Sequence, residues 1–228
     1  MRLHRGITVP DASAASTIAT IRQDGLQRRT TGWGMVAQDL KPHIDRIWSL
    51  PSITSADVTL IEQDHAPRWV CACADTTSAL FYACKHNVHK EDDTPLLITF
   101  NADLSQVIVD GRDFLYPLFQ IGNPEHARPI AVHLFGSAIL RYVDRAWNTK
   151  RTDAEQRIAI CSLAVQDEEV IAAHARNTAV IQGRHRTEFR SAFMARLPVE
   201  PSRIAAVENV RAKVVTFPTP EITLEMLR

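Results

Sequence analysis

Two short segments of this 228-residue chain carry the side chains best suited to chemistry. Towards the C-terminal end, GRHRTEFR places Glu188 among Arg184, Arg186 and Arg190. At the N-terminal end, LHRG brings a histidine, an arginine and a glycine together before any helix begins. Guanidinium groups bind phosphates and carboxylates through a planar fork of donors, so both segments are candidates for holding an anion.

The segment GRHRTEFR is open to three interpretations. Glu188 heads the strand-like run TEFRSAFMA, and strand alternation would place the three arginines and the glutamate on one face, where an anionic molecule meets concentrated positive charge. A basic cluster interrupted by a histidine and a phenylalanine is also typical of a non-catalytic module that binds RNA or DNA. As an ordinary strand edge, the glutamate would only pair with Arg186 or Arg190.

Composition limits the classes of protein to which the chain can belong. Its 26 basic and 26 acidic residues cancel, so any binding to nucleic acid has to come from a local patch. A content of 45% hydrophobic and 23% charged residues is typical of a globular domain with its own core. No apolar run approaches the ~18 residues of a membrane span, and no signal-peptide pattern opens the chain. We therefore expect a cytoplasmic protein without a membrane partner.

Cysteines and histidines between residues 71 and 89 raise the question of a metal site. Cys71, Cys73, Cys84, His86 and His89 are ligand types that zinc accepts, but their spacing differs from that of the common zinc fingers. The first two cysteines alternate as small core residues of a strand do. We therefore expect no metal.

The elements that must position these residues are helices between clusters of strands. Asp11 and Asp75 are candidate helix N-caps, and Gly25 is a candidate helix end. No internal repeat interrupts the chain, so we expect one domain over residues 1–228, mixed α+β rather than alternating βαβ. The periodicity predicts helices over 11–25, 35–51, 75–87, 137–148 and 152–177, the last with a break near Gln166 and Asp167. It predicts strands over 57–63, 68–74, 95–101 and 105–111, an edge segment over 114–123, and strand-like structure over 178–217.

Three motifs, taken in order and spacing, resemble those of the ADP-ribosyltransferase superfamily. LHRG looks like the first-strand motif that holds the nicotinamide end of NAD, and CACADTTSALFYAC is similar to the strand-then-helix segment read as YFAD. RHRTEFRSAFMARLPVEPSRIAAVE is similar to the C-terminal glutamate strand, especially that of the DNA-modifying toxins. The resemblance spans residues 2–208. It implies an α+β fold with a split, mostly antiparallel β-sheet core and flanking helices.

The resemblance also implies an activity, the transfer of ADP-ribose from NAD to an acceptor with release of nicotinamide. Breaking the bond between ribose and nicotinamide develops positive charge on the sugar, which a nearby carboxylate stabilises. Glu188 would be this catalytic carboxylate. Arg5 would fix the diphosphate or a ribose, Gly6 would let the dinucleotide approach the backbone, and His4 would be a neighbouring donor. A toxin or effector with this activity would be delivered into a target cell.

The sequence departs from the family pattern at two places that bear on the substrate. Ala72 stands where YFAD has its tyrosine, and no Ser-Thr-Ser replaces it, so Thr76 and Thr77 would supply the hydroxyl donors for NAD. Arg186, two residues before Glu188, would repel a guanidinium acceptor, which argues against modification of arginine. We expect an acceptor that is DNA, RNA or another anionic molecule, and otherwise a protein. The acceptor-binding residues would be Arg184, Arg186 and Arg190.

Overall fold

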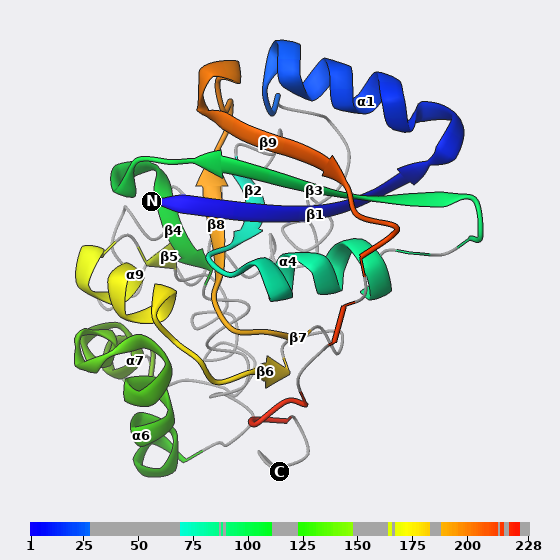
Figure 1. Ribbon diagram of the computed structural model, residues 1–228. Helices are drawn as coiled ribbons and strands as arrows, with labels where there is room; N and C mark the ends of the chain where they lie inside the picture. The colour runs from blue at the N-terminus through cyan, green and yellow to red at the C-terminus, as the bar shows by residue number, and fades with distance from the viewer. Residues whose placement is uncertain are drawn as a thin grey trace, which may run out of the picture.

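The computed structural model describes residues 1–27, 69–86, 88, 90–110, 123–147, 164–165, 167–182, 188–213, 215–216 and 219–223. Figure 1 shows strands and helices packed around one sheet. The strands are β1 (Arg2–Pro10), β2 (Trp69–Cys73), β3 (Asp93–Asn101), β4 (Val107–Asp110), β5 (Ala164–Val165), β6 (Ile181–Gln182), β7 (Glu188–Phe189), β8 (Ala192–Arg196) and β9 (Ile204–Asn209). The α-helices are α1 (Asp11–Asp24), α4 (Thr76–Phe81), α6 (Pro124–Phe135), α7 (Leu140–Trp147) and α9 (Glu168–Ala175).

Within these residues, the strands form a seven-stranded sheet of order β5-β4-β8-β2-β1-β3-β9 and a separate pair, β6-β7. Every pairing between named strands is antiparallel. A single parallel bridge joins Ile181 to Ile222. The mixed α+β class with a mostly antiparallel sheet is therefore confirmed.

The large sheet consists of two parts that meet at one position. On one side, β1 pairs with β3 along its whole length, from Arg2↔Asn101 to Pro10↔Asp93. On the other side, β2 pairs with β8 along its whole length. Between the two parts, β1 and β2 pair only at His4↔Cys73. Figure 1 shows the consequence, since β1, β3 and β9 run across the direction of β8.

The two faces of the sheet bury different clusters, because successive side chains of a strand point to opposite faces. Leu3, Ile98 and Phe193 belong to the larger cluster, which also takes in residues of α1, α6 and α9. On the other face, Cys73 and Leu97 pack with Ala79 of α4 and with Ala83. The helix α4 therefore covers the face of β1 that carries His4, Gly6 and Thr8.

Local signals explain several helix ends. The Asp75 carboxylate accepts a hydrogen bond from the Ser78 backbone N–H at 2.8 Å, so the predicted N-cap is confirmed. The predicted end of α1 is confirmed at Gly25, whose φ of 74° favours glycine. Asp11, by contrast, is no cap, because Pro10 holds the N-cap position. Its carboxylate instead accepts hydrogen bonds from Thr94 and Arg211.

Two elements differ from the prediction. The helix α6 was not predicted; it forms although Pro129 lies inside it, because burial of Ala127, Ala131 and Leu134 outweighs the hydrogen bond that the proline removes. Residues 164–165 form the short strand β5, which pairs with β4. They are not part of the long helix that was predicted over 152–177. The break predicted near Asp167 is confirmed, since this residue caps α9.

The helix predicted over 75–87 is confirmed in its first part and continues from α4 as a π-helical turn, Tyr82–His86. The helix predicted over 35–51 and the strand predicted over 57–63 lie outside the described residues, as does nearly all of the edge segment 114–123.

Candidate functional site

Three segments that are far apart in the sequence meet at the start of α4. Cys73, the last residue of β2, pairs with His4 of β1 on one side and with Ala192 of β8 on the other. Just before β8, the backbone N–H of Arg190 donates to the Ser78 hydroxyl at 3.0 Å. The N-terminal motif, the strand-then-helix motif and the glutamate segment are therefore neighbours in space, although Arg190 follows His4 by 186 positions (190 − 4) in the sequence.

Asp75 connects two of these segments. Its carboxylate caps α4 through one oxygen, and the other oxygen accepts a hydrogen bond from the Ser191 hydroxyl at 3.4 Å. The backbone N–H of Ala74 donates to the Ser191 carbonyl at 3.0 Å. Ser78 and Ser191 are both buried. These contacts fix the bend between β7 and β8 against the first turn of α4.

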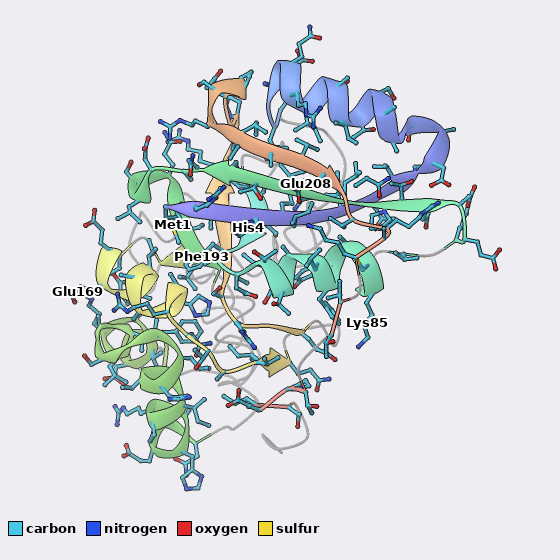
Figure 2. All side chains as sticks on the ribbon, in the orientation of Figure 1. Met1, His4, Lys85, Glu169, Phe193 and Glu208 are labelled. Carbon is cyan, nitrogen blue, oxygen red and sulfur yellow. The ribbon has the colours of Figure 1, made fainter. Side chains whose placement is uncertain are left out.

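Glu188 opens β7 and lies on the same side of the sheet as α4. Its carboxylate is 3.7 Å from the Lys85 ammonium, and 19% of the glutamate side chain is exposed against 54% of the lysine. The Lys85 ammonium also lies 5.0 Å from the centre of the Phe81 ring. Figure 2 labels Lys85 just past the end of α4. The Glu188 carboxylate is therefore partly shielded from solvent and lies beside a cation.

His4 lies on this side of the sheet as well. Its Nδ1 is within hydrogen-bonding distance, 3.0 Å, of the Thr99 hydroxyl on β3. Burial lowers the pKa of His4, the charge of Arg2 lowers it further, and the Asp75 carboxylate opposes both. Among the described residues, the other ring nitrogen of His4 has no hydrogen-bond partner.

Gly6 faces α4 directly, which gives its lack of a side chain a structural reason. A Cβ placed on Gly6 would lie 1.9 Å from the Ala79 carbonyl oxygen and 2.7 Å from the Ala83 backbone nitrogen. The neighbouring Thr8 hydroxyl donates to the Ala83 carbonyl at 3.0 Å. The space above Gly6, expected for a dinucleotide, is therefore occupied by the backbone of α4 and of the turn that follows it.

Arg5 points to the opposite face from His4 and Gly6. Its guanidinium donates to the Cys71 carbonyl at 2.7 Å, across the place where β1 and β2 separate. Burial lowers the pKa of Arg5. The structure thus brings His4 and Glu188 to the α4 side of the sheet and turns Arg5 away from them.

The hydroxyl groups next to the bend differ from those expected. Thr76 is exposed and Thr77 is partly buried, whereas the hydroxyl that contacts the glutamate segment is that of Ser78. Sequence reasoning missed Ser78 and Lys85. The signal was present, because residues 78, 81, 82 and 85 follow the spacing of one helical face.

Of the three arginines expected to bind the acceptor, the structure describes Arg190; Arg184 and Arg186 lie outside the described residues. The run TEFRSAFMA is not one strand, because β7 pairs with β6 whereas β8 pairs with β2 and β4. The chain bends at Arg190 and Ser191 to pass from one sheet to the other. The Nε of Arg190 is buried and has no hydrogen-bond partner. An unsatisfied cationic donor is suited to an anionic ligand.

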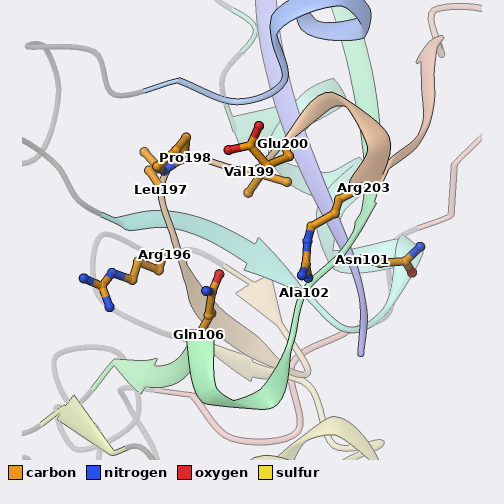
Figure 3. A pocket seen from close by; sticks show the side chains of 9 residues that line it. All are labelled: Asn101, Ala102, Gln106, Arg196, Leu197, Pro198, Val199, Glu200 and Arg203. Atoms are coloured by element: carbon orange, nitrogen blue, oxygen red, sulfur yellow. The ribbon is translucent and has the colours of Figure 1, made fainter.

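A pocket of about 320 Å³ lies at the opposite end of β8. Figure 3 shows Arg196 and Gln106 on one side of it and Arg203 on another. Arg203 already pairs with Asp103 at 2.6 Å. Four residue steps along β8, about 13 Å, separate this pocket from the bend. It is therefore not part of the site around α4.

Neither a metal site nor a membrane span is found in the part of the chain that the structure describes. No three His, Cys, Asp or Glu side chains there are grouped to hold a metal ion, and no helix there is long and apolar enough to cross a membrane. In comparisons with known proteins, no family model, no curated protein and no solved structure matches the chain.

Proposed function

We propose that the chain is an NAD-dependent ADP-ribosyltransferase, which transfers ADP-ribose from NAD to an acceptor and releases nicotinamide. The observation that carries the proposal is that the segments of His4, Asp75 and Arg190 meet at the start of α4, through the Cys73 pairings and the hydrogen bond from Arg190 to Ser78. Glu188 belongs to the last of these segments, and its carboxylate lies beside Lys85, past the end of the same helix. The split between β1 and β2 supports an ADP-ribosyltransferase type of sheet. The three motifs that resemble those of the superfamily, although far apart in the sequence, would then form one site for one reaction.

The reaction breaks the bond between C1′ of the ribose and the nicotinamide nitrogen, and the bonding electrons leave with nicotinamide. A lone pair of the acceptor then forms the new bond to C1′, and the acceptor gives up its proton. Glu188 stabilises the positive charge that develops on the sugar, because its carboxylate is partly shielded from water. The same carboxylate orients the ribose hydroxyl or the incoming acceptor.

The other residues of the site hold the donor in place. His4 presents an imidazole that Thr99 orients from β3. The Asp75 contacts to Ser78 and Ser191 keep the glutamate segment beside α4, so Glu188 is positioned before the substrate arrives. Lys85 balances the charge of Glu188 while the site is open to solvent.

The test is incubation of the purified chain with NAD labelled in the adenylate part, together with separate pools of DNA, RNA and protein. We expect nicotinamide release and transfer of label to one of the pools, with a nucleic acid as the expected acceptor. Absence of both nicotinamide release and labelling would overturn the proposal. Binding of nucleic acid with steep salt dependence but no NAD turnover would indicate the non-catalytic module instead.

A further inference from the structure

Arg190 is held in place by its backbone on both sides. Its N–H donates to the Ser78 hydroxyl of α4 at 3.0 Å, and its carbonyl accepts from the Asn177 side-chain amide at 2.7 Å. That amide also donates to the Ala179 carbonyl, which ties it to the segment leading to β6. The backbone from which the guanidinium extends is therefore fixed by the surrounding elements, as expected of a residue that recognises a ligand.

The guanidinium itself lacks the carboxylate partners that several other described arginines have. Arg128 pairs with Asp144 at 2.8 Å and Arg203 pairs with Asp103 at 2.6 Å. The Nε of Arg190 is buried without any hydrogen bond, and no described carboxylate forms an ion pair with this residue.

The carboxylates next to the bend have other partners. Asp75 bonds to the Ser78 backbone and to the Ser191 hydroxyl, and Glu188 lies beside Lys85. A buried donor without a partner is unfavourable, and more so where the group is charged, so its presence calls for an explanation. A ligand that brings its own negative charge satisfies the donor without any change in these contacts.

The burial of Nε limits which kind of anion can bind to Arg190. Arg190 as a whole is only partly buried, whereas its Nε is buried, so a ligand from solvent meets the terminal nitrogens first and contacts Nε only if its oxygen can enter the shielded place. A planar fork formed by Nε and one terminal nitrogen matches two oxygens of a phosphate or diphosphate. The rigid backbone of a long nucleic acid is less able to enter such a place than a small nucleotide.

We infer that Arg190 binds the diphosphate group of a small nucleotide ligand, through the Nε edge of its guanidinium. The assignment of this diphosphate to NAD rests on the proposed function. This gives Arg190 a role towards the donor of ADP-ribose rather than towards the acceptor.

The experiment is calorimetric titration of the full chain with ADP, pyrophosphate and adenosine at one low salt concentration. Arg190→Met should weaken ADP and pyrophosphate binding about tenfold or more and leave adenosine binding nearly unchanged, because it removes a charge-assisted bidentate contact. Arg190→Lys should fall in between, since an ammonium keeps the charge without the fork. The matched control is Arg196→Met, at the other end of β8, which should bind ADP as the wild type does.

Equal ADP affinity in wild type and Arg190→Met, or no ADP binding by the wild type, would overturn the inference. Loss of affinity for a short DNA oligonucleotide with unchanged ADP affinity would do so too, because it would place Arg190 at the acceptor. If Arg190→Met does not fold, Arg190→Lys decides by the same comparison. If Arg190→Met binds ADP more weakly but the wild type never releases nicotinamide, this inference is supported and the proposed transferase activity is wrong. If the wild type releases nicotinamide but Arg190→Met binds ADP as the wild type does, the transferase activity is supported and this inference is wrong.

Discussion

The carboxylate of Glu188 is held 3.7 Å from the Lys85 ammonium at a partly buried position beside α4. Glu188→Gln keeps the shape of the side chain and removes its charge, so we expect kcat for nicotinamide release to fall about 10²-fold or more while NAD affinity stays nearly unchanged. Steady-state kinetics with calorimetric NAD binding measures both. Glu91→Gln, at an exposed turn, is the control and should leave kcat unaltered. A kcat near that of the wild type in Glu188→Gln would remove this residue from the mechanism.

Arg5 joins the two parts of the sheet through its bond to the Cys71 carbonyl. Arg5→Met removes this hydrogen bond of a buried guanidinium, so we expect the free energy of unfolding to fall by about 1–3 kcal/mol. Urea denaturation measures the change, and Arg2→Met, on the exposed end of the same strand, should stay close to the wild type. If Arg5→Met instead binds NAD more weakly while its stability is unchanged, Arg5 contributes to nucleotide binding and not to the joining of the sheet.

At the scale of elements, the close approach of α4 to β1 depends on Gly6. In Gly6→Ala the new methyl group would come within 1.9 Å of the Ala79 carbonyl oxygen, which belongs to helix backbone and cannot turn aside. We expect a loss of stability of about 1–3 kcal/mol or more, together with lower turnover, because α4 carries the residues that fix the glutamate segment. Thermal unfolding measures the first effect. Ser16→Ala, on the exposed side of α1, should change stability by less than about 0.5 kcal/mol.

A Gly6→Ala protein as stable as the wild type would show that α4 can move away from β1. Unchanged turnover in such a protein would also mean that the position of α4 matters little to the site.

At the scale of the whole molecule, His174 connects the helical layer to the sheet. It is fully buried, with Nδ1 3.2 Å from the Leu134 carbonyl of α6 and Nε2 accepting the Ala192 backbone N–H of β8 at 3.2 Å. Its ring packs on Phe135 and Phe193, with centroids 4.3 and 5.1 Å away. Only a neutral imidazole can accept the Ala192 hydrogen bond while it donates to Leu134.

Burial lowers the pKa of His174 in the folded protein to about 4. In the unfolded chain its pKa is near 6.5, so between these values the unfolded state binds a proton that the folded state does not. Stability should therefore fall as pH drops from about 6.5 towards 4, by about 3 kcal/mol from this residue. Urea denaturation at several pH values measures this. His174→Gln should show a shallower dependence, His126→Gln should keep the wild-type one, and equal slopes in wild type and His174→Gln would contradict the assignment.

Sequence patterns alone determined much of the local structure. The strand-like run PLLITFN, the Asp75 cap and the Gly25 helix end each depend on neighbours within a few residues, so they could be predicted without the fold. The α+β class follows from the clustering of such strands, whereas the mostly antiparallel sheet was expected from the family resemblance. Glu188, as the carboxylate that opens a strand, was also visible from the sequence.

Tertiary structure decided which side chains share a site. Whether His4 or Arg5 faces α4 depends on the face of β1 on which the helix lies, and the bend at Arg190 depends on the joining of β7 and β8 to different sheets. The unpredicted helix α6 exists because burial outweighs the cost of Pro129. Side-chain periodicity is set by adjacent residues, whereas pairing and burial are set by contacts between residues far apart in the chain, which no local pattern encodes.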